Sequence, residues 1–276
     1  MANENETRSV VITGSSKGIG LGLAKVFLAE GCSVAISSFE EEGLAVTYKT
    51  LVEEYGSEKV IKYKCDVTNI EEVEALWNTA KNTFGEIDIW INNAGVVNEF
   101  LDLWEVDPKE ISTIVNTNVV GLLYGVRTAM KGMLEQGFGA LYNFYGFGSN
   151  DERKPAGLTT YGATKRSVRY ITECLIEETR DLPIIVGALM PGTVITDFIL
   201  KVIRSSPKEG HDAMVKGFNV SADTVETVTD FLAKEVLKNT EHGAEINWLT
   251  EEKFMARLKD PYYQNRDLFK ELNIKL

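Results

Sequence analysis

Short apolar runs rich in β-branched residues alternate with amphipathic helical segments along most of this chain. The runs are nearly continuous, which is typical of strands buried on both faces of a parallel sheet. Parallel neighbours need a crossover, usually a helix, so the alternation predicts an α/β fold with helices on both faces of the sheet. The expected strands are 9–13, 33–38, 59–67, 87–95, 139–145, 184–190 and 244–249. The expected helices are 19–31, 40–55, 70–85, 108–135, 158–180 and 223–238, with an irregular segment at 193–221.

The composition excludes several classes of protein. The formal net charge is −12 over 276 residues, which argues against nonspecific binding of nucleic acid or anionic membranes. Three scattered cysteines and two distant histidines favour neither a disulfide framework, nor a metal site, nor a Ser-His-Asp hydrolase. No signal peptide is recognised at the start, and no apolar run reaches the ~20 residues of a membrane helix, so we expect a cytoplasmic protein.

A glycine-rich loop, "TGSSKGIG" (13–20), joins the first expected strand to the first helix. Gly14 allows a tight turn there, Gly18 lets the backbone approach a phosphate, and Gly20 lets the helix pack on the sheet. The helix N-terminus offers unpaired N–H groups to the pyrophosphate of a nucleotide. A glycine pattern alone is weak, but its place in the first strand–loop–helix unit favours nucleotide binding over a plain turn.

With four later motifs, this loop resembles the short-chain dehydrogenase/reductase family over roughly residues 8–200. The motifs are "NNAG" (92–95), "NVVG" (118–121), "YGATK" (161–165) and "PGTVIT" (191–196). The resemblance implies one Rossmann-type domain over residues 1–276, doubly wound, with a seven-stranded parallel sheet. It also implies a homodimer or homotetramer formed through the helices at 108–135 and 158–180. "SKGIG", "IDIWINNAG", a Gly-x-Gly-Ser segment and "YGATKRSV" are similar to the chlorophyll b reductase-like branch.

Tyr161 and Lys165 are expected to carry the chemistry. Residues four apart share a helix face, so the Lys165 charge can lie close to the Tyr161 hydroxyl. A nearby cation lowers the pKa of a tyrosine from its usual value of ~10, toward the range useful in general acid–base catalysis. The resemblance implies that Lys165 also binds the nicotinamide ribose and that Asn118 holds a water of a proton relay. The alternative for Asn118 is a polar residue that distorts a buried helix.

The serine that the family places after the fifth strand is not found at its usual position. Counting from Asn143, that position is Gly146; counting back from Tyr161, it falls near Ser149. Three possibilities follow: Ser149 replaces the missing donor, the Tyr145 hydroxyl replaces it, or no side chain does. We take Ser149 as the catalytic candidate.

The remaining expected site residues bind the cofactor, and they are taken from the resemblance. They are Gly14, Ser15, Ser16, Lys17, Gly18, Ile19, Gly20, Ser38, Asp66, Val67, Asn93, Ala94, Gly95, Pro191, Gly192, Val194 and Thr196, with Tyr161 and Lys165. Ser38 ends the second strand without the acidic side chain that would repel a 2′-phosphate, and Lys17 is placed to meet that phosphate. NADP(H) is therefore expected in preference to NAD(H), although Glu40, Glu41 and Glu42 follow closely.

The sequence thus predicts an oxidoreductase that moves a hydride between a nicotinamide and a carbonyl or alcohol, with Tyr161 as general acid and base. The substrate is a small molecule, with a formyl or ketone group on a bulky apolar compound as one option. Residues 193–221 fill the place of the substrate loop, and the tail at 250–276 suits a subunit contact or closure of the site. The main alternative is a catalytically weak NADP(H) sensor, favoured by Gly146. A sugar-nucleotide epimerase is disfavoured by the spacing of the glycines.

Overall fold

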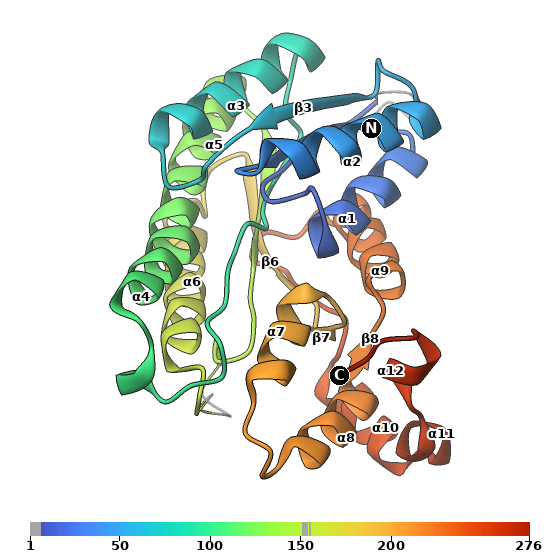
Figure 1. Ribbon diagram of the computed structural model, residues 1–276. Coiled ribbons are helices and arrows are strands. Elements are labelled where there is room, and N and C mark those ends of the chain that lie inside the picture. Colours follow the sequence, from blue (N-terminus) through green and yellow to red (C-terminus); the bar gives the residue numbers. More distant parts are fainter. Residues whose placement is uncertain (1–6, 151–153, 155) are drawn as a thin grey trace.

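The structure is a computed structural model that describes residues 7–150, 154 and 156–276 (Figure 1). Residues 1–6, on which the expectation of no signal peptide rests, lie outside the described part, as do 151–153 and 155.

Seven strands form one parallel sheet in the order β3-β2-β1-β4-β5-β6-β9. They are β1 (Ser9–Ile12), β2 (Ser33–Ser38), β3 (Val60–Lys64), β4 (Ile89–Asn92), β5 (Gly139–Phe144), β6 (Ile184–Met190) and β9 (Glu245–Asn247). The winding reverses beside β1, because β2 pairs on one side of it and β4 on the other. In such sheets ligands bind at the carboxyl ends of the strands next to this reversal. The predicted fold class, an α/β Rossmann-type fold with a seven-stranded parallel sheet, is confirmed.

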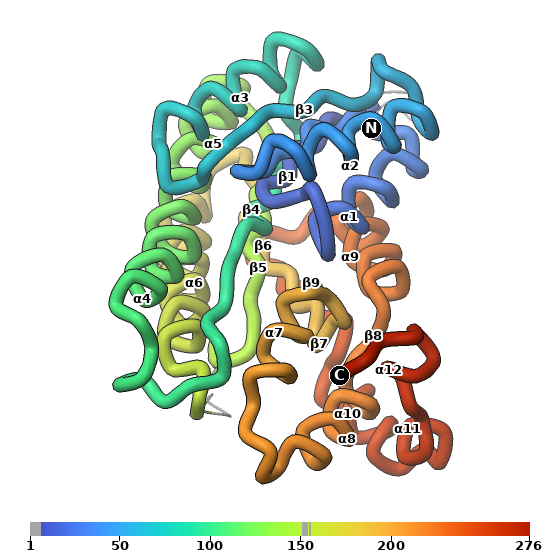
Figure 2. Tube along the Cα trace, in the orientation of Figure 1, coloured from blue at the N-terminus to red at the C-terminus, as the bar shows by residue number. Residues whose placement is uncertain are grey.

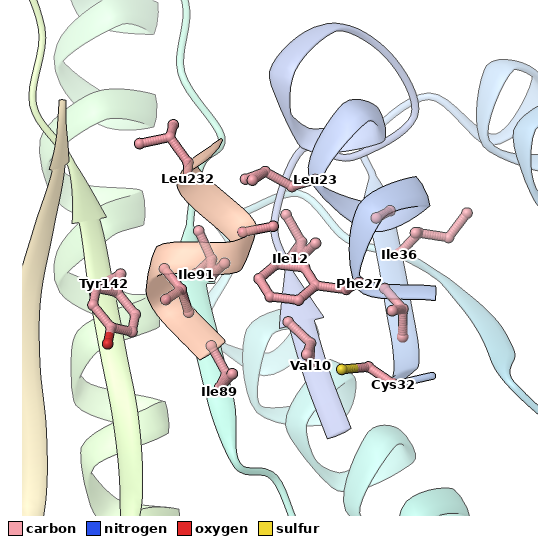
Figure 3. Close-up of a cluster of buried hydrophobic side chains, with 14 of the residues drawn as sticks. Val10, Ile12, Leu23, Phe27, Cys32, Ile36, Ile89, Ile91, Tyr142 and Leu232 are labelled. Carbon is pink, nitrogen blue, oxygen red and sulfur yellow. The ribbon is translucent and has the colours of Figure 1, made fainter. Parts of the chain in front are cut away.

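Helices cover both faces of the sheet (Figures 1 and 2). One layer holds α1 (Gly18–Ala29), α2 (Glu41–Tyr55) and α9 (Val225–Lys238); the other holds α3 (Ile70–Phe84), α5 (Leu122–Gln136) and α6 (Thr159–Glu178). Figure 3 shows the first core, where Phe27 and Leu232 meet Ile12 from the sheet. Trp90, fully buried, belongs to the opposite core. Because both faces are covered, the strands read as continuous apolar runs.

The helix expected at 108–135 is not continuous. It consists of α4 (Pro108–Val115), a π-helical segment (Asn116–Gly121) and α5. Asn118 lies in the π-helical segment, where its side chain bonds to backbone outside the helix. Such wide turns occur mostly at functional positions. The sequence shows the polar residue but not the widened turn.

The segment at 193–221 is more regular than expected, so that prediction was wrong in part. It holds β7 (Thr193–Val194), α7 (Asp197–Ser205) and α8 (His211–Ser221), and β7 pairs in parallel with β8 (Ala222–Asp223). The chain then ends with α10 (Glu251–Lys259), α11 (Pro261–Asn265) and α12 (Leu268–Glu271), and its C-terminus lies close to β8 and α8 (Figure 2). These helices are short, which makes their periodicity hard to detect by sequence pattern alone.

A buried charge cluster holds the C-terminal segment to β8. The Asp223 carboxylate accepts hydrogen bonds of 2.7 Å from both Trp248 Nε1 and Arg257 Nη2. Arg266 Nη1 lies 3.8 Å from the same carboxylate, and the ring of Tyr263 lies beside both guanidinium groups. Each arginine also donates to backbone carbonyls around the end of α8. The cluster therefore fixes the tail against the substrate side of the molecule.

Candidate functional site

A cleft with a volume of about 2170 Å³ opens at the carboxyl ends of the strands. Every residue expected to bind a cofactor lines it except Ser15. Ligand pockets usually measure about 300–1,000 Å³, so this cleft can hold a dinucleotide and a second molecule beside it. The folding of the chain thus brings the predicted cofactor residues together.

The glycine loop forms one end of the cleft. Gly14 and Gly18 have φ values of +63° and +58°, in the left-handed region that favours glycine. A Cβ atom at Gly20 would lie 2.5 Å from the carbonyl oxygen of Gly14, so only glycine lets α1 begin this close to the loop. Lys17, at the N-cap of α1, makes no side-chain capping bond. The first N–H groups of α1 therefore remain available to an anionic group in the cleft.

Hydrogen bonds within the protein hold this loop in shape. The hydroxyl of the fully buried Ser15 donates to the Ile12 carbonyl and accepts from the N–H of Ser37. The Asn93 amide donates to the carbonyl oxygens of Thr13 and Gly14. Ser15 and Asn93 thus shape the loop, and their side chains are engaged by the protein itself. The Thr13 hydroxyl, which accepts from the N–H of Asn93, was missed in the sequence although it opens the quoted loop.

Ser38 carries no charge and lies at the same end of the cleft as the glycine loop, because the neighbouring Ser37 hydrogen-bonds to Ser15 of that loop. The buried Ser38 accepts a hydrogen bond from the N–H of Glu40, and both residues line the cleft beside the exposed Phe39. Lys17 Nζ lies 3.9 Å from the Asp197 carboxylate, and both side chains are exposed. Lys17 can leave this contact and turn toward an anionic ligand, because an exposed ion pair contributes little free energy.

Tyr161 is buried in an apolar surround at the centre of the cleft. Val97, Leu158 and Val202 pack around it, and the ring of Phe198 lies 5.2 Å from its own. Burial raises the pKa of Tyr161 above its usual value. Burial therefore acts against the lowered pKa expected from the sequence, because an apolar surround disfavours the charged tyrosinate.

Lys165 lies one turn along α6 from Tyr161. Its ammonium donates a hydrogen bond of 3.0 Å to the carbonyl oxygen of Phe144, at the end of β5. The same ammonium lies 5.9 Å from the centre of the Tyr161 ring. Burial lowers the pKa of Lys165 to about 8. The lysine is thus fixed by the sheet, close to the tyrosine, and its charge is sensitive to pH just above neutrality.

Asn118 positions the elements around this pair. Its side-chain oxygen accepts from the N–H of Val96 at 2.8 Å, and its amide donates to the Val96 carbonyl at 2.9 Å. The amide also donates to the Thr164 hydroxyl at 3.0 Å, on the turn of α6 between Tyr161 and Lys165. The side chain bonds to these groups and not to Lys165. It joins the segment after β4 to α6, which the sequence pattern did not reveal.

The other end of the cleft is apolar. Its side chains come from the segment after β4, from α7 and α8, and from the C-terminal segment: Phe100, Phe198, Met214, Phe218, Leu249, Phe254 and Met255. Lys201 of α7 spans this end, donating to the Val97 carbonyl at 3.0 Å and to the Glu110 carboxylate at 2.8 Å. Such walls suit a bulky apolar ligand.

Comparison with known proteins identifies the family. The profile of the family described as short chain dehydrogenase matches residues 8–206. The chain belongs to the short-chain dehydrogenase family. An oxidoreductase class, as expected from the sequence, follows from this membership.

Among its relatives, this dehydrogenase is similar to chlorophyll(ide) b reductases of plants. It is 35% identical, over 96% of its length, to a probable chloroplastic chlorophyll(ide) b reductase of Oryza sativa subsp. japonica, of which it spans 54%. It is 37% identical, over 83% of its length, to a chloroplastic chlorophyll(ide) b reductase of Arabidopsis thaliana, of which it spans 65%. The predicted family and branch are confirmed, and the chain spans about half to two-thirds of these relatives.

A solved structure, ElxO with NADP bound, is similar to this chain. The two share 27% sequence identity and a TM-score of 0.74, over 88% of this chain and 98% of that one.

The turn after β5 explains why the two ways of finding the family's serine disagree. The N–H of Ser149 donates to the Gly146 carbonyl at 2.9 Å, and Gly148 has a φ of +94°. A four-residue turn brings its ends within about 7 Å, so both candidate positions lie at one place in the cleft. Ser149 lines the cleft and remains a candidate donor.

Tyr145 is poorly placed to act as that donor. It packs in the core beneath α6, with the Arg169 guanidinium 5.2 Å from the centre of its ring. Arg169 lies about two helical turns, roughly 12 Å, along α6 from Tyr161. Burial raises the pKa of Tyr145 to about 12. The geometry therefore disfavours Tyr145 among the three possibilities.

Two further observations concern the part of the chain that the structure describes. None of its helices is both long and apolar enough to cross a membrane. Within residues 7–150, 154 and 156–276, no three His, Cys, Asp or Glu side chains gather in a way that could hold a metal ion.

Proposed function

We propose that this protein is an NAD(P)H-dependent reductase that converts a carbonyl group into an alcohol. The observation that carries the proposal is the placement of Tyr161 and Lys165 on one face of α6, in the same cleft as the glycine loop. The family membership and the reductase names of the relatives support it. They do not favour the alternative of a catalytically weak sensor.

The residues of the cleft fit a nicotinamide dinucleotide. The unpaired N–H groups of α1 suit its pyrophosphate, and close packing at Gly14 and Gly20 holds the loop open for it. When bound, the reduced nicotinamide supplies a hydride, which carries two electrons, to the carbonyl carbon. Val194 and Thr196 line the cleft where they can hold the carboxamide, and Lys165 lies within reach of the ribose.

The protein supplies the proton. Tyr161 keeps its proton at neutral pH, since a tyrosine has an ordinary pKa of ~10 and burial raises this pKa further. Its hydroxyl donates first a hydrogen bond and then the proton to the carbonyl oxygen, leaving a tyrosinate that the Lys165 ammonium stabilises. Solvent then returns a proton to the tyrosinate. The carbonyl is reduced by the hydride and the proton together, so charge and atoms balance.

We propose NADPH over NADH as the coenzyme. Ser38 carries no charge, and the exposed ammonium of Lys17, 3.9 Å from the Asp197 carboxylate, can turn toward a 2′-phosphate. An aspartate at residue 38 would accept hydrogen bonds from the ribose and repel the phosphate. Ser38→Asp should therefore lower kcat/KM for NADPH at least ~10-fold relative to NADH, and an unchanged ratio would count against this choice.

The substrate is proposed to be a formyl or ketone group on a bulky apolar ring system. The apolar end of the cleft has room for such a molecule beside a dinucleotide, and two of the relatives are named as chlorophyll(ide) b reductases. A chlorin with a formyl group is the first compound to test. Aromatic aldehydes of increasing size form the rest of the series.

The deciding experiment measures oxidation of NADPH and NADH by the purified protein against these compounds, with Tyr161→Phe as the control. We expect turnover that falls at least ~100-fold in the variant while coenzyme binding stays the same. If both proteins bind the coenzyme but neither reduces any compound, the NADP(H) sensor becomes the better supported function.

A homo-oligomer is proposed through the helices α4, α5 and α6. Leu123 and Tyr170 are large side chains that stay exposed on α5 and α6. Exposed apolar side chains on neighbouring helices favour a contact between subunits. Light scattering should give the mass of a dimer or tetramer, and Tyr170→Asp should shift it toward the monomer. A monomeric wild-type protein would refute this part.

A further inference from the structure

Gly146 lies directly against the catalytic pair. A Cβ atom added to this residue would be 2.5 Å from Tyr161 Oη, 3.2 Å from Lys165 Cε and 3.3 Å from Lys165 Cδ. A carbon atom cannot approach a hydroxyl oxygen to 2.5 Å without displacing it, since van der Waals contact begins well beyond this distance. The Tyr161 hydroxyl therefore occupies the space that any side chain at residue 146 would need.

The backbone is not the reason for a glycine at this position. Gly148, two residues later, has a φ of +94°, which side chains rarely tolerate, whereas Gly146 is not among the glycines with positive φ. Its backbone would accept alanine or serine. What excludes a side chain is the contact with Tyr161 and Lys165, on a different element of the fold.

We propose that Gly146 is a positioning residue whose missing side chain lets the Tyr161 hydroxyl lie against the backbone that follows β5. The proposal rests on the proposed function, in which this hydroxyl donates the proton. Restoring the serine that other members of the family carry should then lower the activity of this protein, because the hydroxyl would be displaced. A displacement of about 1 Å at reacting atoms can cost roughly 100-fold in rate.

The first test measures the contact itself and needs no substrate. Gly146→Ala should lower the melting temperature by roughly 2–8 °C, because it overpacks a filled site. In the Tyr161→Phe background, where the hydroxyl is absent, the same substitution should cost at most half as much. Gly43→Ala is the matched control: its Cβ would meet only a Glu40 side-chain oxygen at 4.0 Å, so it should not lower the melting temperature.

The second test measures catalysis by Gly146→Ala and Gly146→Ser. We expect kcat to fall at least ~10-fold in both variants, while the Kd for NADPH, which a general loss of structure would raise, stays within about twofold. Gly43→Ala should keep the wild-type kcat. A Gly146→Ser protein as active as the wild type would overturn the proposal. Equal destabilisation by Gly146→Ala in both backgrounds would overturn it as well.

The failure of this proposal can be told from failure of the proposed function. If the wild-type protein reduces no carbonyl compound, the function is refuted, and the melting temperatures still decide whether Gly146 positions the Tyr161 hydroxyl. If the wild-type protein is an active reductase and the glycine variants match it, only the role of Gly146 is refuted.

Discussion

Phe198 lies edge-on to Tyr161, with 5.2 Å between the ring centroids and 68° between the ring planes. The contact joins α7, which covers the substrate end of the cleft, to the residue that we propose as general acid. An edge-to-face pair of this kind contributes about 0.5–1.5 kcal/mol beyond the burial of its surface. Through Phe198, α7 therefore contacts Tyr161, the residue that we propose as general acid.

Removing this ring should affect large substrates most. Phe198→Ala is expected to lower kcat/KM for bulky aromatic aldehydes about 10-fold, because the substrate loses an apolar wall and Tyr161 loses its neighbour. Steady-state kinetics across aldehydes of increasing size measure the effect. Trp104→Ala, which removes a largely exposed ring outside the cleft, is the matched control and should behave as the wild type. Equal losses for every aldehyde, small or large, would contradict a role in substrate contact.

The activity should depend on pH through Lys165. Its pKa is about 8, so the ammonium is present below pH 8 and is lost as the pH rises through that value. Loss of the cation removes the charge that stabilises the Tyr161 tyrosinate and so raises the pKa of Tyr161 further. We therefore expect kcat/KM for reduction to decline above about pH 8. Lys165→Arg keeps a charge beyond pH 12, so any activity it retains should not decline there. A decline near pH 8 in both proteins would assign it to another group.

The side chain of Asn118 should contribute to stability as well as to catalysis. Asn118→Ala leaves the N–H and carbonyl of Val96 and the hydroxyl of Thr164 without these partners in a buried place. We expect the free energy of unfolding to fall by about 1–3 kcal/mol, measured by urea denaturation. Asn265→Ala, at an exposed position of α11, is the control and should change it little. A stable Asn118→Ala protein would refute the positioning role.

The buried cluster at Asp223 should be far more sensitive than a surface ion pair. Asp223→Asn removes the carboxylate that faces the guanidinium groups of Arg257 and Arg266. We expect a loss of about 3 kcal/mol in the free energy of unfolding, because a buried charge is left uncompensated. Asp230→Asn breaks an exposed pair with Lys234 and should cost less than about 1 kcal/mol. Similar losses in the two variants would argue against this account.

The features of the site that the sequence predicted are local in the chain. The glycines of the loop and the spacing of Tyr161 and Lys165 are set by a single turn or a single helix, so their geometry follows from adjacent residues. The order of strands and helices likewise follows from apolar periodicity. The predicted site residues line the cleft, with the exceptions of the fully buried Ser15 and of Asn118, which is also buried.

What the sequence could not predict depends on contacts between distant elements. The Asn93 amide turns to the glycine loop, Asn118 bonds to Val96, and the Tyr161 hydroxyl fills the place beside Gly146. The direction of the Tyr161 pKa belongs to the same group, because it depends on how completely the surrounding helices exclude water. No pattern along the chain reports these arrangements.

The match to the family model ends at 206, in the connection between α7 and α8. Met214, Phe254 and Met255, which line the apolar end of the cleft, all come after this point. In the function that we propose, most of the apolar side chains that would meet the substrate therefore follow the stretch that would hold the coenzyme. Substitutions after residue 206 are then expected to change the choice of substrate more than the binding of the coenzyme.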